Sequence, residues 1–430
     1  MKHLFFGGIH PQYSKEMSTK TDVFRTITPK QVVIPLQQHI GAPCSPLVKV
    51  GDRVLRGQKI GDGEGLCVPV HASVSGTVTA IERRPHPSLG TSMSIVIDND
   101  FKDETVTMTP ATSDDEILHA IREAGIVGMG GAAFPGNVKA LTSLGKIDTL
   151  IANACECEPY ITADDSLLRT DAAHVLEGMI ILRGLLKPQR VVLAVEDNKA
   201  AAIAKVRTMQ NDFPDVEVVV LPTRYPQGAE KQLVQAVTGR EIAPGNLPVS
   251  VGCAVFNVST FAAIYRAVRL GEPLTQRIVT ISGEAIAEPQ NFIVRIGTTF
   301  HDLIEAAGGL NDRTERVISG GPMMGMAQSD LSVPVIKATN SILCLLKDKN
   351  GAADNPVCLR CGKCVAVCPL RLQPLYLYRF VNAGRLDELN RLHLMDCMEC
   401  GSCAFTCPGK LPLVERFRKG KKMLKEANAK

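Results

Sequence analysis

The spacing of apolar residues changes along the chain, and each change marks a predicted domain. From residue 32 to 99, apolar and polar residues alternate in short runs separated by Gly and Pro, which predicts a compact all-β unit. Two of these runs, 48–54 and 74–78, are alike, because each places a turn between short strands. Together with the segment that precedes it, this unit is the first predicted domain, residues 1–105.

Residues 106–272 alternate between helical and strand patterns. Ser113 and Glu116 form a capping box at the start of a helix that ends at Gly125, because a hydroxyl and a carboxylate at this spacing satisfy free backbone N–H groups. Further along are strand patterns at 149–152, 190–195 and 216–221 and helical patterns at 164–186 and 198–210. This alternation is typical of an α/β domain with a largely parallel sheet.

The next segment, residues 273–346, has a different order of elements. Strand patterns at 277–284 and 291–296 precede a helical pattern at 299–307, which predicts a small β-grasp-like module. A polar linker at 347–356 then leads into a last domain, 347–430, whose residues 370–394 have helical character. The predicted fold class is a multidomain α/β and β protein that ends in a helical domain.

Composition and charge exclude two classes of function. The net charge is only +4, Trp is absent and aromatic residues make up 4%, so neither a basic nucleic-acid surface nor a base-stacking platform is expected. A membrane span needs about 20 mostly apolar residues, and the most apolar helical stretch, 179–186, is interrupted by Arg183. The chain is therefore predicted to have no transmembrane segment of its own.

Basic residues concentrate near the C-terminus, where they alternate with apolar ones in a helical pattern. A solvated surface helix is the simpler interpretation, and a docking element for an acidic partner or a membrane surface is the alternative. The basic residues are Arg416, Arg418, Lys419, Lys421, Lys422 and Lys425.

Eight of the 14 cysteines form two similar runs, each with the spacing C-x-x-C-x-x-C-x-x-x-C-P. This is the bacterial ferredoxin spacing for [4Fe–4S] clusters, in which the fourth cysteine of each run ligates the other cluster. The spacing therefore predicts two cross-ligated clusters that carry single electrons. Cluster 1 is assigned to Cys358, Cys361, Cys364 and Cys407, and cluster 2 to Cys397, Cys400, Cys403 and Cys368.

Zinc and disulfide bonds are the alternatives for these cysteines. Zinc sites usually combine one pair of cysteines with a second, distant pair, whereas here three cysteines fall within seven residues, twice over. A disulfide framework is typical of secreted proteins, but residues 1–10 contain no apolar secretory core. Both alternatives are weaker than the cluster assignment.

Four separate segments of the α/β domain have the composition of ligand-binding loops. Glycines allow backbone N–H groups to approach a phosphate or a flat ring, and carboxylates that follow a parallel strand lie where ligands bind. A glycine turn packed only for structure is the competing interpretation of the first segment, and small part-buried residues that of Cys155 and Cys157. The segments are 128–139, 153–159, 225–231 and 253–260.

In this order, the four segments resemble the FMN- and NADH-binding subunit of respiratory complex I. The resemblance implies that Phe134 stacks on the nucleotide and that Glu158 and Glu230 lie on the NADH side. Cys155, Ala229 and Ser259 stand where that family carries carboxylates. The residues that the resemblance implies for FMN are Gly128, Gly130, Gly131, Lys139, Asn153, Cys155, Glu156, Tyr225, Gly228, Asn257 and Thr260.

The whole chain resembles the C subunits of Rnf electron-transport complexes. Two features carry this resemblance: the N-terminal motif Phe-Gly-Gly-Ile-His-Pro at 6–11 and the order of the domains. The all-β unit resembles a barrel-sandwich hybrid, but its hairpin tip at 71–76 has no lysine for a prosthetic arm. The resemblance implies two [4Fe–4S] clusters, FMN and NAD(H) as cofactors. It also implies a peripheral place on the cytoplasmic side of the bacterial membrane, with the other subunits as partners and ferredoxin as an indirect one.

These cofactors suggest one route for electrons, because FMN exchanges two electrons with NADH as one hydride and single electrons with the clusters. Two alternative functions retain some of these cofactors. One is a flavin/iron–sulfur corrinoid reductase of a bacterial microcompartment, and the other is a non-enzymatic electron relay whose α/β domain has lost its ligand. No nucleophilic catalytic set is evident, and His10, His39, His71 and His174 are most simply surface or core residues.

Overall fold

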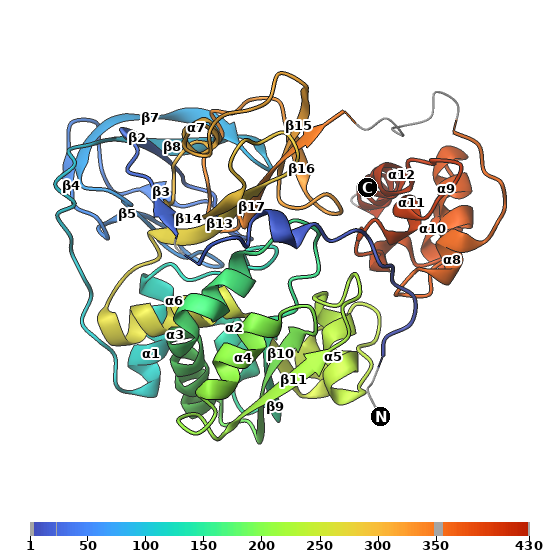
Figure 1. Cartoon of the computed structure of the whole chain (residues 1–430), viewed down its shortest axis with the longest axis horizontal. Coiled ribbons are helices and arrows are strands. Elements are labelled where there is room, and N and C mark those ends of the chain that lie inside the picture. The colour runs from blue at the N-terminus through green and yellow to red at the C-terminus, as the bar shows by residue number, and fades with distance from the viewer. Residues whose placement is uncertain (1–3, 23, 348–355, 429–430) are drawn as a thin grey trace.

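The computed structural model describes residues 4–22, 24–347 and 356–428, so most of the predicted linker at 347–356 lies outside the described residues. Two β-rich units lie on one side of the α/β domain, and the C-terminal helical domain stands beside them (Figure 1). This is the predicted fold class. The boundaries predicted at 105, 272 and 346 fall at or between regular elements and stay predictions.

The first β-rich unit consists of two small sheets that enclose a core of Val and Ile side chains, among them Val32, Ile60 and Ile97. One sheet has the order β2-β8-β7-β4 and the other β3-β5-β6, and all of their pairings are antiparallel. Their bounds are β2 Gln31–Pro35, β3 Ser45–Pro46, β4 Arg53–Val54, β5 Lys59–Asp62, β6 Val70–His71, β7 Gly76–His86 and β8 Gly90–Asn99.

The α/β domain has a four-stranded parallel sheet of order β11-β10-β9-β12, as the alternating pattern predicts. The strands are β9 Thr149–Ala154, β10 Arg190–Glu196, β11 Val216–Leu221 and β12 Cys253–Asn257. The helices are α1 Asp114–Glu123, α2 Gly136–Ser143, α3 Ala163–Leu186, α4 Ala200–Thr208, α5 Glu230–Thr238, the 3-10 turn η2 Pro248–Val251 and α6 Val258–Leu270.

Two local features of this domain agree with the sequence patterns. The capping box of Ser113 and Glu116 is formed in both directions. Helices α3 and α6 approach closely, since a Cβ at Gly178 would overlap the carbonyl oxygen of Phe261. Because the strands are parallel, the loops after β9 and β12 meet at one edge of the sheet.

The β-grasp module has a mixed sheet of order β1-β14-β13-β17-β15-β16, packed on α7 through Phe292, Phe300 and Ile342. Strand β1, from the N-terminal segment, pairs in parallel with β14, so that segment reaches beyond the barrel. The elements are the 3-10 turn η1 Lys15–Met17, β1 Arg25–Thr26, β13 Gln276–Ser282, β14 Gln290–Arg295, α7 Phe300–Ala306, β15 Thr314–Ser319, β16 Met326–Gln328 and β17 Ser341–Leu346.

The C-terminal domain contains two matching turns, in which Gly362 and Gly401, both left-handed, precede the short helices α8 and α11. The helical stretch predicted at 370–394 is broken at Gly384, whose φ is +65°. The elements are α8 Lys363–Ala366, α9 Pro374–Asn382, α10 Leu386–Arg391, η3 Leu394–Asp396, α11 Ser402–Phe405 and α12 Leu413–Asn428. In the described part of the chain, no helix has both the length and the apolarity to cross a membrane.

The basic C-terminal segment is helix α12, and one side of it belongs to the core of the C-terminal domain. Leu413, Phe417 and Leu424 are buried there, and Lys421 donates to the carbonyl oxygen of Cys397 and pairs with Glu399. The opposite side is solvated and carries Lys419, Lys422 and Lys425.

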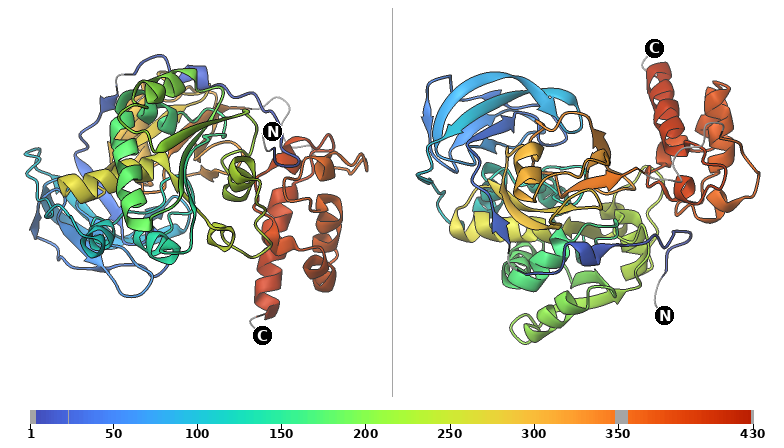
Figure 2. Two further views of the ribbon diagram at one scale, coloured as in Figure 1. Left: turned by 90° about the horizontal axis from the view of Figure 1, so that it is seen from below. Right: turned by 45° about the horizontal axis from the view of Figure 1, so that its top comes forward.

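Residues 5–11, which we call the N-terminal strap, connect the α/β and C-terminal domains (Figure 2). The N–H of Gly8 donates to the carbonyl oxygen of Val367 at 2.9 Å, and Ile9 exchanges two backbone hydrogen bonds with Tyr225. Gly7 has a φ of +72°, and a Cβ there would meet the Val367 carbonyl oxygen at 2.7 Å. These contacts explain why glycines precede Ile9 in the strap.

Candidate flavin and iron–sulfur sites

A cavity of about 520 Å³ lies at the carboxyl ends of β9 and β12. This volume is within the range of about 300–1,000 Å³ that is usual for cofactor sites. All fourteen residues predicted to contact FMN or NADH line it, and they come from the four segments that were singled out in the sequence. The cavity therefore brings together residues that are more than a hundred positions apart.

The glycine-rich segment forms one wall of this flavin cavity. Its backbone is fixed by Gly128 N–H, which donates to the Phe134 carbonyl oxygen at 2.9 Å, and by Met129 N–H, which donates to Thr260 Oγ1 at 3.0 Å. A Cβ at Gly130 would approach Asn257 Nδ2 to 2.7 Å, so only glycine leaves room there. At its three glycines, Gly128, Gly130 and Gly131, this wall consists of backbone without side chains. Such a surface allows the close approach of a flat ring or a phosphate.

Two asparagines hold the loops after β9 and β12. Asn153 Nδ2 donates to the carbonyl oxygen of Gly228 at 2.9 Å, and Asn257 Nδ2 donates to Asp164 Oδ2 at 2.6 Å. Burial raises the pKa of Asp164 to about 6. Asp164, at the start of α3, was not predicted as a site residue, because its position next to Asn257 depends on the packing of α3 against the sheet.

Cys155 and Cys157 are buried thiols, and neither belongs to a group of three metal-ligating atoms within 4.8 Å of one another among the described residues. Cys155 Sγ lies 3.5 Å from the carbonyl oxygen of Ala194 in β10, so its side chain points into the sheet. Cys157 Sγ accepts from the N–H of Gly228 at 3.4 Å. Burial raises the pKa of both thiols. The interpretation of these cysteines as small buried loop residues agrees with this geometry.

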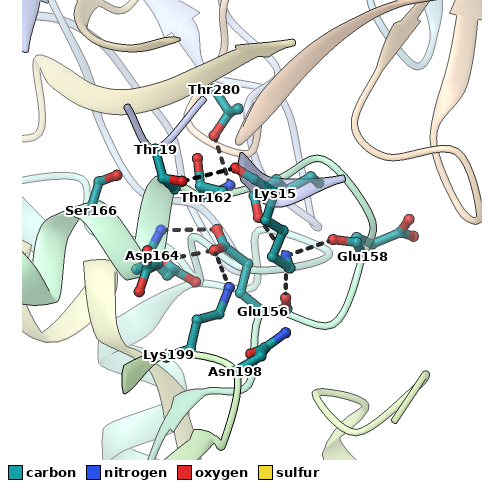
Figure 3. A network of polar contacts seen from close by, with 12 residues as sticks. Lys15, Thr19, Glu156, Glu158, Thr162, Asp164, Ser166, Asn198, Lys199 and Thr280 are labelled. Atoms are coloured by element: carbon teal, nitrogen blue, oxygen red, sulfur yellow. Dashed lines mark hydrogen bonds and ion pairs between the residues drawn. The ribbon is translucent and has the colours of Figure 1, made fainter. Parts of the chain in front are cut away.

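A lysine from the N-terminal segment holds the 156–161 loop through several hydrogen bonds (Figure 3). Lys15 Nζ donates to three carbonyl oxygens: Glu156 at 2.7 Å, Glu158 at 2.9 Å and Ile161 at 2.6 Å. The stem of Lys15 is half-buried, but its ammonium is enclosed, and this burial lowers the pKa of Lys15 to about 8. Lys15 therefore holds the loop in shape through all three of its donors.

The carboxylate of Glu156 completes this network. It accepts from the N–H of Asp164 at 2.9 Å and lies 3.7 Å from the ammonium of Lys199, which is also buried. The loop under the flavin cavity is thus fixed by two lysines that sequence patterns did not single out.

The two carboxylates predicted for the NADH side have different surroundings. Glu158 accepts from the N–H groups of Met323 and Met324 at 3.1 and 3.0 Å, and burial raises its pKa to about 7. Glu230, at the start of α5, accepts from Lys139 Nζ at 2.6 Å and stays partly exposed. Of the two, only Glu230 is free of contacts with the β-grasp module among the described residues.

Replacing Lys15 by Met is expected to destabilise the flavin site. Three part-buried carbonyl oxygens would lose their donor, and because each such hydrogen bond contributes about 1 kcal/mol to stability, we expect a loss of about 3 kcal/mol in unfolding free energy. Differential scanning calorimetry and the release of bound flavin on heating would measure this. The matched variant Lys20→Met changes an exposed lysine of the same segment and should leave both unchanged; equal effects of the two variants would contradict the role of Lys15.

The eight cysteines of the C-terminal runs line two cavities, four to each. One is lined by Cys358, Cys361, Cys364 and Cys407, and the other by Cys397, Cys400, Cys403 and Cys368. Each cavity takes three cysteines from one run and the last cysteine from the other run, which is the grouping that the sequence predicts for clusters 1 and 2.

The separation of these sulfur atoms fits a cluster better than a single ion. A tetrahedral zinc ion holds its sulfur ligands about 2.3 Å from the metal, which brings them close together. Throughout the described residues, no three of the eight cysteines bring their sulfur atoms within 4.8 Å of one another. The donor set therefore suits two iron–sulfur cubes, whose thiolates bind different corners.

The cavity of cluster 2 shares a wall with the flavin cavity. Leu370, Met398 and Cys400 line both. Tyr225, which lines the flavin cavity, is buried beside this wall, and its hydroxyl donates to the carbonyl oxygen of Cys400 at 2.7 Å. The cavity of cluster 1 does not share these residues, and its Cys361 is exposed. Leu370 and Met398 were not predicted at the flavin site, because the contact between the two domains is not visible in either sequence pattern.

Four family models match consecutive parts of the chain. They are described as the RnfC barrel sandwich hybrid domain at residues 3–102, the Nuo51 FMN-binding domain at 121–266, the SLBB domain at 278–327 and a 4Fe-4S dicluster domain at 357–411. The solved structure of an NAD+-reducing [NiFe]-hydrogenase has a similar fold, with a TM-score of 0.52 and 22% identity over 74% of this chain and 65% of that chain.

Curated relatives match almost the whole chain. The C subunit of the Na(+)-translocating ferredoxin:NAD(+) oxidoreductase complex of Acetobacterium woodii is 45% identical over 98% of this chain and 97% of its own length. The proton-translocating counterpart of Clostridium ljungdahlii is 45% identical over 87% and 83%. The C subunit of the ion-translocating oxidoreductase complex of Salmonella arizonae is 43% identical over 97% of this chain, which spans 63% of that protein. The chain thus belongs to the family of C subunits of ion-translocating ferredoxin:NAD+ oxidoreductase complexes, the Rnf complexes.

Proposed function

We propose that this chain carries FMN and two [4Fe–4S] clusters and passes electrons between NAD(H) and the other subunits of a membrane complex. The observation that carries the proposal is the wall of Leu370, Met398 and Cys400 between the flavin cavity and the cavity of cluster 2. When bound, FMN would supply the conversion between the two-electron hydride of NADH and the single electrons of the clusters. The residues of the chain hold, orient and shield the cofactors.

The donor set of the cavity supports FMN as its ligand. Gly128, Gly130 and Gly131 offer a backbone surface without side chains, and Lys139 offers a positive charge beside it. Asn153 and Asn257 fix the two loops on the other side. A flat ring with one phosphate needs such a combination of close backbone approach and one cation.

The two clusters would stand in series. Cluster 2 would lie beside the flavin, and cluster 1 would lie towards the solvent, where Cys361 and the neighbouring Leu359 are exposed. We therefore propose that another protein of the complex exchanges electrons with cluster 1 and that cluster 2 is the intermediate carrier.

We place NAD(H) at the mouth of the flavin cavity, next to Phe134 and Glu230. Replacing Glu230 by Gln would remove the negative charge and leave Lys139 unpaired, so the KM for NADH should rise by about tenfold, which corresponds to about 1.4 kcal/mol. Iron and FMN contents should stay unchanged. Steady-state kinetics with NADH and an artificial acceptor would measure the change.

The control for this variant is Glu217→Gln, which removes a similarly exposed ion pair with Arg190 at the amino ends of β10 and β11, the opposite end of the sheet from the cavity. Its KM for NADH should equal that of the unchanged protein. If Glu230→Gln also leaves KM unchanged, Glu230 has no role in nucleotide binding.

As partners we propose the other subunits of an Rnf complex, with ferredoxin as an indirect one, and as location the cytoplasmic side of the bacterial membrane. The solvated lysines of α12 are available for docking there. Relatives of equal identity are named for Na+ and for H+, so we assign the choice of coupling ion to the other subunits.

Anaerobic purification followed by iron, sulfide and flavin analysis tests the proposal, with the visible spectrum recorded as NADH is added. We expect about eight irons and one FMN per chain and bleaching of both chromophores. Eight irons without flavin and without a response to NADH would instead support the electron-relay scaffold. The corrinoid reductase alternative is disfavoured by the identity to C subunits over the full chain.

A further inference from the structure

Three metal-ligating side chains lie together in the N-terminal barrel, remote from the eight cluster cysteines. His39 and Cys44 belong to the loop between β2 and β3, and Cys67 belongs to the loop between β5 and β6. Cys44 Sγ lies 3.5 Å from Cys67 Sγ, and Cys67 Sγ lies 3.7 Å from His39 Nε2. All three donor atoms are within 4.8 Å of one another, and all three residues are buried.

These separations are close to those of ligands around one tetrahedral ion. With bonds of about 2.3 Å to sulfur and about 2.0–2.1 Å to nitrogen, tetrahedral angles place two sulfurs, or a sulfur and a nitrogen, about 3.5–3.8 Å apart. The two measured separations, 3.5 and 3.7 Å, fall in this range.

The imidazole of His39 is oriented as a ligand. Its Nδ1 lies 3.2 Å from the carbonyl oxygen of Ile40, so Nδ1 carries the proton and donates it to that oxygen. Nε2 is then the acceptor: it accepts from the N–H of Val68 at 3.3 Å and lies 3.7 Å from Cys67 Sγ, so a bound metal would replace the hydrogen bond from Val68. A backbone carbonyl that fixes the tautomer in this way is the usual second contact of a metal-bound histidine.

The three residues are buried, but exposed residues flank them in both loops, at 40–43 and at 64–65. On the inner side, the ammonium of Lys337 is engaged by the carbonyl oxygens of Pro69 and Gly125, both at 2.7 Å. Lys337 is therefore engaged elsewhere and does not serve as a fourth ligand.

We propose that His39 Nε2, Cys44 Sγ and Cys67 Sγ bind one Zn2+ ion, with water in the fourth position. Binding forms two Zn–S bonds and one Zn–N bond and releases the two thiol protons to solvent, so no electrons are transferred. The ion joins the two loops of the barrel. One of these loops supports the flavin cavity, because the N–H of Ile40 donates to the carbonyl oxygen of Ala133 at 3.3 Å.

Zinc analysis of the full-length holoprotein tests this proposal. After anaerobic purification from cells grown with added zinc sulfate, mass spectrometry of the metals should find about one zinc beside about eight irons per chain. In the double variant Cys44→Ser/Cys67→Ser, zinc should fall at least tenfold while iron stays unchanged. The matched control Cys253→Ser/Cys344→Ser alters two buried cysteines elsewhere and should keep its zinc.

X-ray absorption spectroscopy at the zinc edge identifies the ligands of the zinc ion in the unchanged protein. It therefore tests the proposal even if the double variant does not fold. In the unchanged protein, we expect two sulfurs at about 2.3 Å and nitrogen or oxygen at about 2.0–2.1 Å. A shell of four sulfurs would place zinc in the cluster cavities and overturn the proposal. So would a protein that contains eight irons but no zinc, whether its Cys44 and Cys67 are free thiols or a disulfide in mass spectra of alkylated peptides.

Discussion

Replacing Cys368 by Ser is expected to remove cluster 2 and to interrupt electron transfer between NADH and cluster 1. Cys368 lines the cavity of cluster 2, which shares a wall with the flavin cavity. Iron should fall from about eight to about four per chain. NADH should still bleach the flavin, but the remaining cluster should no longer be reduced through the protein. Iron analysis and electron paramagnetic resonance after rapid mixing with NADH would measure both effects.

Cys407→Ser is the matched variant, because Cys407 has the same place in the second run but lines the cavity of cluster 1. It should also lose about four irons, yet NADH should still reduce the cluster that remains. Cys361→Ser gives a reference spectrum for a protein without cluster 1. If Cys368→Ser has the same spectrum as Cys361→Ser, the cross-ligation is wrong.

Replacing Gly228 by Ala should remove most of the bound flavin. The new Cβ would overlap the carbonyl oxygen of Cys155, and both residues line the flavin cavity. The two loops must then move apart, and overpacking of this kind costs about 1–3 kcal/mol. We expect flavin affinity to fall by about 5–150-fold with iron content unchanged. Fluorescence titration of deflavinated protein with FMN would measure the affinity.

Gly184→Ala is the control for this variant. Gly184 lies in α3, is exposed, and a Cβ there meets no atom within 4 Å. Alanine is favoured over glycine in a helix by about 1 kcal/mol, so this variant should bind FMN normally and be equally or more stable. Equal flavin affinities for both variants would show that the contact between Gly228 and Cys155 does not shape the site.

Local patterns were sufficient to predict part of the elements. The strands β9, β10 and β11 and the capped helix α1 appear where apolar periodicity and Ser113 place them. Strand β12 and the start of α6 instead occupy segment 253–260, which the sequence indicated only as a ligand-binding loop. The ferredoxin spacing also predicted which cysteines line which cavity, because the short loops of each run restrict what its fourth cysteine can reach. These features depend on residues close together in the chain.

Contacts between distant segments could not be predicted. Lys15 reaches three carbonyl oxygens of the 156–161 loop, and Tyr225 bonds to Cys400 of the C-terminal domain. Nothing in the local pattern around Lys15 distinguishes it from a solvated lysine such as Lys20. The sequence around His39 likewise indicates only a surface or core residue. Cys44 and Cys67 lie next to it only because the folded barrel brings the loop between β2 and β3 to the loop between β5 and β6.

The N-terminal strap has a consequence for how the cofactors are loaded. The hydrogen bond between Gly8 and Val367 joins two residues that are far apart in the chain. It cannot form until the ribosome has synthesised Val367, near the C-terminal end. Ordering such distant partners is slow, because the loop between them must close first. The strap can therefore complete its contacts only late in assembly, after the residues around Val367 have been synthesised. We expect flavin and iron–sulfur clusters to be inserted before these contacts form, while the wall between their cavities is still open.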